Sequence, residues 1–223
     1  MNKQKTIYHF VLDQSGSMSD CIDATLAGLK DQRDKIISIA KEFPEQEIRV
    51  GLTVFNHDVE IKYEDVPAEK LPSIQQIEYR PNGSTALLDA IGLSVLKAEN
   101  QLINEGDTAI IVILTDGHEN ASRYYSLSQI RDLIKSKEDS GKFTFSFLGA
   151  TLDAVDMAEK MNIRRDNSAY FEKSQMKDAV FNRVSDSIQN YMDRKRKGED
   201  LKKFWQMGST KSKKIMADNL KII

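Results

Sequence analysis

The sequence contains one cysteine, no long hydrophobic run and no internal repeat, and each shortage excludes a class of protein. Because Cys21 is alone, the sequence predicts neither an internal disulfide nor a zinc site made of thiolates. No apolar run approaches the length of a membrane-spanning helix, so we expect no membrane association. The apolar run after Thr6 is too short for a secretory signal, which predicts a cytoplasmic protein.

Charge is unevenly distributed along the 223 residues, although the formal net charge is only -2. Residues 194–223 contain ten Lys or Arg and three Asp or Glu, whereas the remainder of the chain is acidic. We therefore expect one domain over residues 1–193 and a basic extension over residues 194–223. Phe204 and Trp205 of the extension are expected to dock on the domain, and contact with nucleic acid or an acidic partner is the less favoured alternative.

Apolar residues change their period along the chain, from runs typical of strands to the three-and-four spacing of helices. Asp20 is expected to cap the first helix, and Pro44 to end it. Gly106 is expected to close a later helix that begins near Leu88. The expected strands are residues 6–12, 47–55, 59–63, 108–114, 142–148 and 169–171, and the expected helices are residues 20–43, 88–102, 126–139, 152–161 and 175–191.

Strands that alternate with helices predict an α/β fold, with a mostly parallel sheet and helices on both faces. A tight turn at Asn56-His57-Asp58 joins the second and third strands as a hairpin, so the third strand is expected to be antiparallel at one edge. Six strands suggest the doubly wound order 3-2-1-4-5-6. In that order the first and fourth strands are neighbours where the winding reverses, and ligands bind outside the carboxyl ends of strands at that point.

Five residues with oxygen-bearing side chains are predicted to meet at this point of the sheet. Asp13, Ser15 and Ser17 lie on one tight loop after the first strand, Thr85 lies just before a helix, and Asp116 follows the fourth strand. Two carboxylates and three hydroxyls suit a hard divalent cation such as Mg²⁺, which prefers oxygen ligands in near-octahedral geometry. The sequence therefore predicts a metal site at the carboxyl edge of the sheet.

This pattern resembles the metal-ion-dependent adhesion site of the von Willebrand factor A domain, also called the integrin I-type domain. The family motif is Asp-x-Ser-x-Ser, a distant Thr and a distant Asp. Asp13-Gln14-Ser15-Gly16-Ser17 matches the first part, Gly83-Ser84-Thr85-Ala86-Leu87 the second, and Leu114-Thr115-Asp116-Gly117 the third. The resemblance covers roughly residues 5–192, with no part of the motif missing, and is closest to bacterial intracellular members.

The resemblance implies a protein-binding module that depends on a metal ion. Mg²⁺ or Mn²⁺ would be held by the five residues, with Ca²⁺ the less suited ion, and an acidic side chain of a partner protein would complete the coordination. Bacterial members of the family often work beside ATPases, which makes an ATPase-linked assembly one candidate partner. We do not expect an enzyme, because the sequence positions no catalytic base beside a nucleophile.

Other interpretations of the motif stay open at this point. A metal-dependent hydrolase would use the same cation, with Asp116 or His118 as the base. In a metal-free scaffold, Ser17 and Thr85 would merely cap helices. A phosphate loop is disfavoured because no Gly-Lys-Ser/Thr follows, and an aspartyl phosphotransferase because Ser15 stands where a second carboxylate is needed.

Residues around the motif are candidates either for a binding rim or for simple packing. His118 could touch a ligand, although a solvated loop residue is the favoured interpretation. Tyr124 and Tyr125 could line the rim as anchors for a partner, or equally well pack beneath the loop. His9 in the first strand is expected to pack inside, and Cys21 to act as a small apolar group at a helix start.

Overall fold

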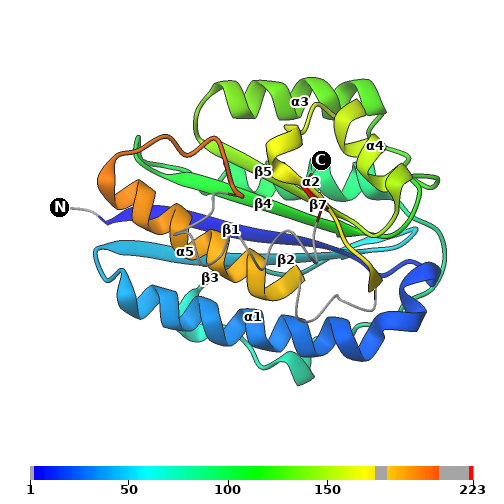
Figure 1. Ribbon diagram of the computed structural model, residues 1–223, viewed down its shortest axis with the longest axis horizontal. Helices are drawn as coiled ribbons and strands as arrows, with labels where there is room; N and C mark the ends of the chain where they lie inside the picture. Colours follow the sequence, from blue (N-terminus) through cyan, green and yellow to red (C-terminus); the bar gives the residue numbers. More distant parts are fainter. Residues whose placement is uncertain (1–2, 174–179, 206–220, 223) are drawn as a thin grey trace.

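A computed structural model describes residues 3–173, 180–205 and 221–222, and its centre is one twisted sheet (Figure 1). The strand order is β3-β2-β1-β4-β5-β6-β7, which confirms the predicted order 3-2-1-4-5-6 and adds a two-residue strand beyond β6. The strands are β1 Gln4–Asp13, β2 Gln46–Phe55, β3 Val59–Pro67, β4 Thr108–Thr115, β5 Phe143–Gly149, β6 Ser168–Tyr170 and β7 Lys221–Ile222.

Strand direction follows the connections between the strands. β2, β1, β4, β5 and β6 are parallel to one another, because each link between them crosses the sheet through a helix. β7 is antiparallel to β6. β3 is antiparallel to β2, as predicted, since only a three-residue turn joins them. That turn is held by Asn56, whose backbone N–H donates to the Asp58 carbonyl at 3.0 Å, and whose side-chain oxygen accepts the Asp58 N–H at 2.9 Å.

Helices cover both faces of the sheet, as the alternating pattern predicted. The helices are α1 Ile22–Glu42, α2 Leu87–Glu99, α3 Leu127–Asp139, α4 Leu152–Lys160 and α5 Asn182–Lys197. Figure 1 shows α1 on one side of the sheet, and α3 and α4 on the other. Side chains of α1 and α5 pack with Tyr8, Phe10 and Leu12 of β1, whereas those of α2, α3 and α4 pack with Ile7 and Val11. Alternate residues of the central strand thus bury into two separate cores.

Two predicted helix boundaries were wrong. Asp20 does not cap α1, because a 3-10 segment over Gly16–Cys21 precedes the helix and Cys21 occupies the N-cap position. Gly106 does not close α2, which ends at Glu99. The turn after α2 is instead held by the Asp107 carboxylate, which accepts the backbone N–H groups of Ile103 at 3.1 Å and Asn104 at 2.8 Å.

The last helix runs further than its apolar stripe indicated. Its predicted start lies partly outside the described residues, but α5 continues to Lys197, where Gly198 ends it in the left-handed conformation. The boundary expected after residue 193 therefore falls inside a helix. Phe204 and Trp205 are buried in the core shared by α1 and α5, which confirms that the aromatic pair docks on the domain.

No helix among the described residues is long and apolar enough to cross a membrane.

Candidate metal site at the carboxyl edge of the sheet

The first and fourth strands bring the two acidic residues of the motif together. β1 and β4 pair in register from Thr6 opposite Thr108 to Leu12 opposite Leu114, so Asp13 and Asp116 follow neighbouring strand ends. Beyond this point the chain leaves β1 toward α1 on one face, and leaves β4 toward α3 on the other. The two loops separate, and the strand ends between them stay open for a ligand.

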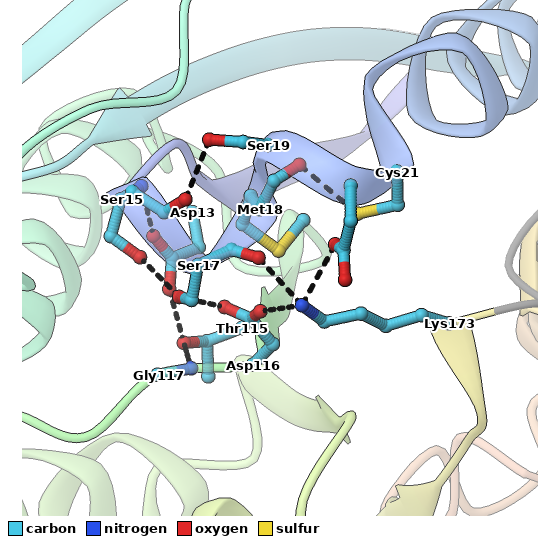
Figure 2. A network of polar contacts seen from close by, with 12 residues as sticks. Asp13, Ser15, Ser17, Met18, Ser19, Cys21, Thr115, Asp116, Gly117 and Lys173 are labelled. Carbon is cyan, nitrogen blue, oxygen red and sulfur yellow. Dashed lines mark hydrogen bonds and ion pairs between the residues drawn. The ribbon is translucent and has the colours of Figure 1, made fainter.

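The loop after β1 folds back onto the Asp13 carboxylate (Figure 2). Asp13 Oδ1 accepts the backbone N–H of Ser15 at 2.6 Å, and Oδ2 accepts the hydroxyl of Thr115 at 2.5 Å. The Tyr79 hydroxyl donates to the Asp13 carbonyl at 2.7 Å. Asp13 therefore holds the loop and the end of β4 in one arrangement.

The side chains of the motif converge on a common space. The hydroxyls of Ser15 and Ser17 lie 3.1 Å apart, and the Ser17 hydroxyl donates to Asp116 Oδ1 at 2.6 Å. A Cβ placed on Gly117 would lie 2.8 Å from the Thr85 hydroxyl, and 3.4 Å from both Asp13 Oδ2 and the Ser15 hydroxyl. The three oxygens thus converge on Gly117 so closely that any side chain at this position would clash with the Thr85 hydroxyl.

Burial shapes the charge of this cluster. Asp13 is fully buried, and this burial raises the pKa of its carboxyl from 3.8 to about 6 against the lowering effect of its hydrogen bonds from Thr115 and Ser15. Asp116 Oδ2 is also buried, and the Lys173 ammonium lies 2.5 Å from it. Buried carboxylate oxygens are stabilised by a nearby cation, so the donor set also fits a hard divalent metal ion.

The site differs from metal centres built mainly of acidic, histidine or cysteine side chains. Among the described residues, no group of three or more His, Cys, Asp or Glu side chains is placed to hold a metal. The present set has two carboxylates, and its other oxygens are the hydroxyls of Ser15, Ser17 and Thr85. A metal held here would be bound partly by neutral hydroxyls, which leaves room for an outside anion in its coordination.

Two acidic residues that the sequence analysis did not single out hold the loop around Thr85. Asp89, in the first turn of α2, accepts the backbone N–H groups of Arg123, Tyr124 and Tyr125 at 2.7 to 3.0 Å. Glu119 bonds to the backbone N–H groups of Ala121, Ser122 and Leu88 at 2.9 to 3.1 Å. Asp89 was marked in the sequence only by its position in the first turn of a helix, and no local pattern marked Glu119.

A side-chain amide of the same loop fixes Thr85 itself. Asn120 Oδ1 accepts the Thr85 N–H at 2.9 Å, and the Thr85 carbonyl accepts the Asn120 N–H at 3.0 Å. The loop after β4 and the start of α2 are therefore one bonded unit, which positions the Thr85 hydroxyl.

The residues considered for a binding rim separate into different environments. Tyr124 is 82% exposed, whereas the Tyr125 ring packs against α2 at Gly92. Both tyrosines line a pocket of about 630 Å³ together with His57. His118 is also exposed, and its Nε2 lies 3.4 Å from an Asp153 carboxylate oxygen of α4. Tyr124 and His118 are thus the rim candidates that project into solvent, and Tyr125 supports the loop from beneath.

Lys173, which the sequence did not indicate as a site residue, follows β6 and reaches into the cluster (Figure 2). Its ammonium lies 2.5 Å from Asp116 Oδ2, 2.9 Å from Asp20 Oδ1 and 2.6 Å from the Ser17 carbonyl oxygen. Partial burial lowers the pKa of Lys173, but its bonds to Asp116 and Asp20 outweigh this and raise the pKa above 10.5. The group is therefore a cation at neutral pH. No sequence pattern marked it, because it is more than 50 residues from the nearest motif residue.

Solved structures with a similar fold include two pilus proteins. Similarity to the pilus adhesin SpaC from Lactobacillus rhamnosus GG has a TM-score of 0.66 at 14% identity, covering 86% of this chain and 31% of that chain. The vWF domain of the type V pili tip protein Mfa5 from Porphyromonas gingivalis has a TM-score of 0.63 at 12% identity, covering 94% and 99%. At this level of identity the likeness shows the fold alone.

A third similar structure is the von Willebrand factor type A protein from Catenulispora acidiphila, with a TM-score of 0.55 at 13% identity. The similarity covers 86% of this chain and 43% of that protein. This chain therefore spans less than half the length of the Catenulispora protein and of SpaC. No sequence among curated proteins matches the chain. The family model described as von Willebrand factor type A domain matches residues 9–194, which includes every strand from β2 to β6 and all five motif residues. The chain therefore belongs to the von Willebrand factor type A domain family.

Proposed function

We propose that this domain binds a divalent cation and that the cation coordinates an acidic side chain of a partner protein. Asp13, Ser15, Ser17, Thr85 and Asp116 would hold the ion. The observation that carries the proposal is the convergence of the Asp13, Ser15 and Thr85 oxygens around Gly117, next to the hydrogen-bonded pair of Ser17 and Asp116. Mg²⁺ and Mn²⁺ suit this set better than Ca²⁺, because the site is compact and Ca²⁺ takes more ligands at longer distances.

The neutral hydroxyls explain why an acidic partner would be attracted. Only Asp13 and Asp116 bring negative charge, and Asp13 is also engaged by Thr115 and the Ser15 backbone. Because these bonds hold Asp13, we expect it to reach the ion through water, which leaves Asp116 as the carboxylate in direct contact. The ion then keeps a positive charge, which a further carboxylate would offset. The exposed Tyr124 beside the site offers the type of aromatic contact that often anchors protein interfaces.

Binding is favoured over hydrolysis because the described residues place no free base at the site. His118 contacts Asp153, and Asp116 is engaged by the Ser17 hydroxyl and the Lys173 ammonium. One similar structure is named a pilus adhesin, a protein of attachment, which supports a binding role. From the sequence, we also propose that the protein is cytoplasmic and that one candidate partner is an ATPase-linked assembly.

Isothermal titration with Mn²⁺ and Mg²⁺ tests the metal part of the proposal. Ser17→Ala should weaken binding about tenfold or more, because it removes a hydroxyl that both faces the ion and orients Asp116. Ser19→Ala is the matched control, since this hydroxyl bonds to the Gly16 carbonyl on the same loop, and its affinity should stay within about twofold of wild type. Absence of binding by the wild-type protein at millimolar metal would reject the proposal.

Capture of partners from a lysate of the source cells tests the second part. Proteins retained by the wild-type domain in Mg²⁺ should be lost in chelator and lost again with Asp116→Ala, because both conditions remove the ion that links the two carboxylates. Partners retained equally by wild type in Mg²⁺, in chelator and by Asp116→Ala would show that binding uses another surface.

A further inference from the structure

The Lys173 ammonium occupies the space beside an oxygen that the proposed metal also needs. Asp116 Oδ2 is a buried oxygen whose close cationic neighbour is Lys173 Nζ at 2.5 Å (Figure 2). A divalent ion bound through this carboxylate would lie about 2.0–2.1 Å from its oxygen. Two cations at such separations from one carboxylate group would repel each other strongly in a partly buried site. The lysine and a metal therefore compete for Asp116.

The contacts of Lys173 are built from the same loop that carries the motif. Its ammonium also bonds to the Ser17 carbonyl at 2.6 Å and to the Asp20 carboxylate at 2.9 Å. Three oxygens from two loops thus surround one ammonium, which is the number of donors it has. The arrangement is a satisfied cation site within the motif and is not a chance contact of a solvated side chain.

Release of the ammonium would require little change in the fold. The Lys173 side chain is 28% exposed, and its stem is long and flexible. Phe171, two residues earlier, is buried, and its N–H bonds to the Gly149 carbonyl at 3.0 Å, which anchors the end of β6 independently of Lys173. Asp20 is 66% exposed in its side chain, and could keep the ammonium after it leaves Asp116.

We propose that Lys173 is a tethered competitor of the metal ion, so that Asp116 is paired either with Lys173 or with the metal. Lys173 then determines how much divalent cation is needed before the site becomes able to take an acidic partner. This inference rests on the proposed function, because it concerns the affinity of that same site. If the ammonium occupies Asp116 in about nine molecules of ten, the apparent metal affinity falls about tenfold below its intrinsic value.

The test is calorimetric titration of the full chain with Mn²⁺ at constant ionic strength. Lys173→Met, which keeps the length of the side chain and removes its charge, should bind Mn²⁺ about tenfold more tightly than wild type. Lys173→Arg keeps the charge and should stay close to wild type. Lys135→Met is the matched control, because Lys135 forms an exposed ion pair with Asp139 on α3, and its affinity should be unchanged.

The outcomes distinguish competition by Lys173 from metal binding by the site. Equal Mn²⁺ affinity of wild type and Lys173→Met, or weaker binding by Lys173→Met, would overturn the competition while leaving metal binding intact. No Mn²⁺ binding by either protein would overturn the proposed function and the competition together. Circular dichroism spectra and melting temperatures of the variants in chelator show whether each is folded. If Lys173→Met is unfolded, Lys173→Gln takes its place with the same expected gain.

Discussion

Replacing Phe204 by alanine is expected to lower the free energy of unfolding by about 3–5 kcal/mol, the usual range for removing a buried phenylalanine. The Phe204 ring is fully buried in the core formed by α1, α5 and one face of the sheet. It packs edge-on against Trp205, with ring centroids 5.0 Å apart. Its backbone N–H donates to Asn167 Oδ1 at 2.7 Å, so the backbone would hold the emptied site in place and the cavity could not close easily.

Urea denaturation followed by circular dichroism measures this change. Ile103→Ala is the control, because Ile103 is 80% exposed and its loss should change stability by less than about 0.5 kcal/mol. A loss below about 1 kcal/mol for Phe204→Ala would mean that residues 198–205 are not part of the cooperative unit. The expected result would place the folded domain's end beyond residue 193.

Mild acid is expected to destabilise the protein through His9. Burial lowers the pKa of His9 from 6.5 to about 4. Between pH 4 and pH 6.5, His9 is therefore protonated in the unfolded chain and neutral in the folded chain. The part of the free energy of unfolding that depends on neutral His9 is therefore fully present above pH 6.5. It decreases as the pH falls toward 4, and it is absent below pH 4. Its full size is about 3 kcal/mol, of which about 2 kcal/mol is lost by pH 5.

A variant without a titrating group isolates this contribution. His9→Gln keeps a polar group that can bond to Thr53, whose hydroxyl lies 2.8 Å from His9 Nε2. Urea midpoints measured at pH 7 and pH 5 should show wild type losing about 2 kcal/mol more than His9→Gln. The raised pKa of Asp13 has the opposite trend with pH, but it is present in both proteins and cancels in the comparison. Parallel pH profiles for the two proteins would contradict the assignment to His9.

The helices, the strands and their order were predictable because local sequence patterns indicate them. The run from Thr108 to Leu114 is apolar at every position after the first, as a strand buried on both faces requires, and the hairpin turn at 56–58 set the direction of β3. Errors fell at the ends of elements, and β3 continues to Pro67, beyond its expected end at residue 63. A 3-10 turn displaced Asp20 from its expected cap, and the Asp107 turn ended α2 before Gly106, since ends depend on single hydrogen bonds.

The sequence by itself determined the α/β fold, the strand order and the residues that gather at the switch point, because periodicity and connection lengths leave few alternatives. Only the tertiary structure decided which other groups contact the residues at the switch point. Lys173 is brought to Asp116 from 57 positions away, and Phe204 is buried although it lies in a basic stretch. Such contacts depend on how close the ends of separate elements lie in the folded chain, and no local sequence pattern gives that separation. The tertiary fold thus supplies the internal cation that the motif alone did not reveal.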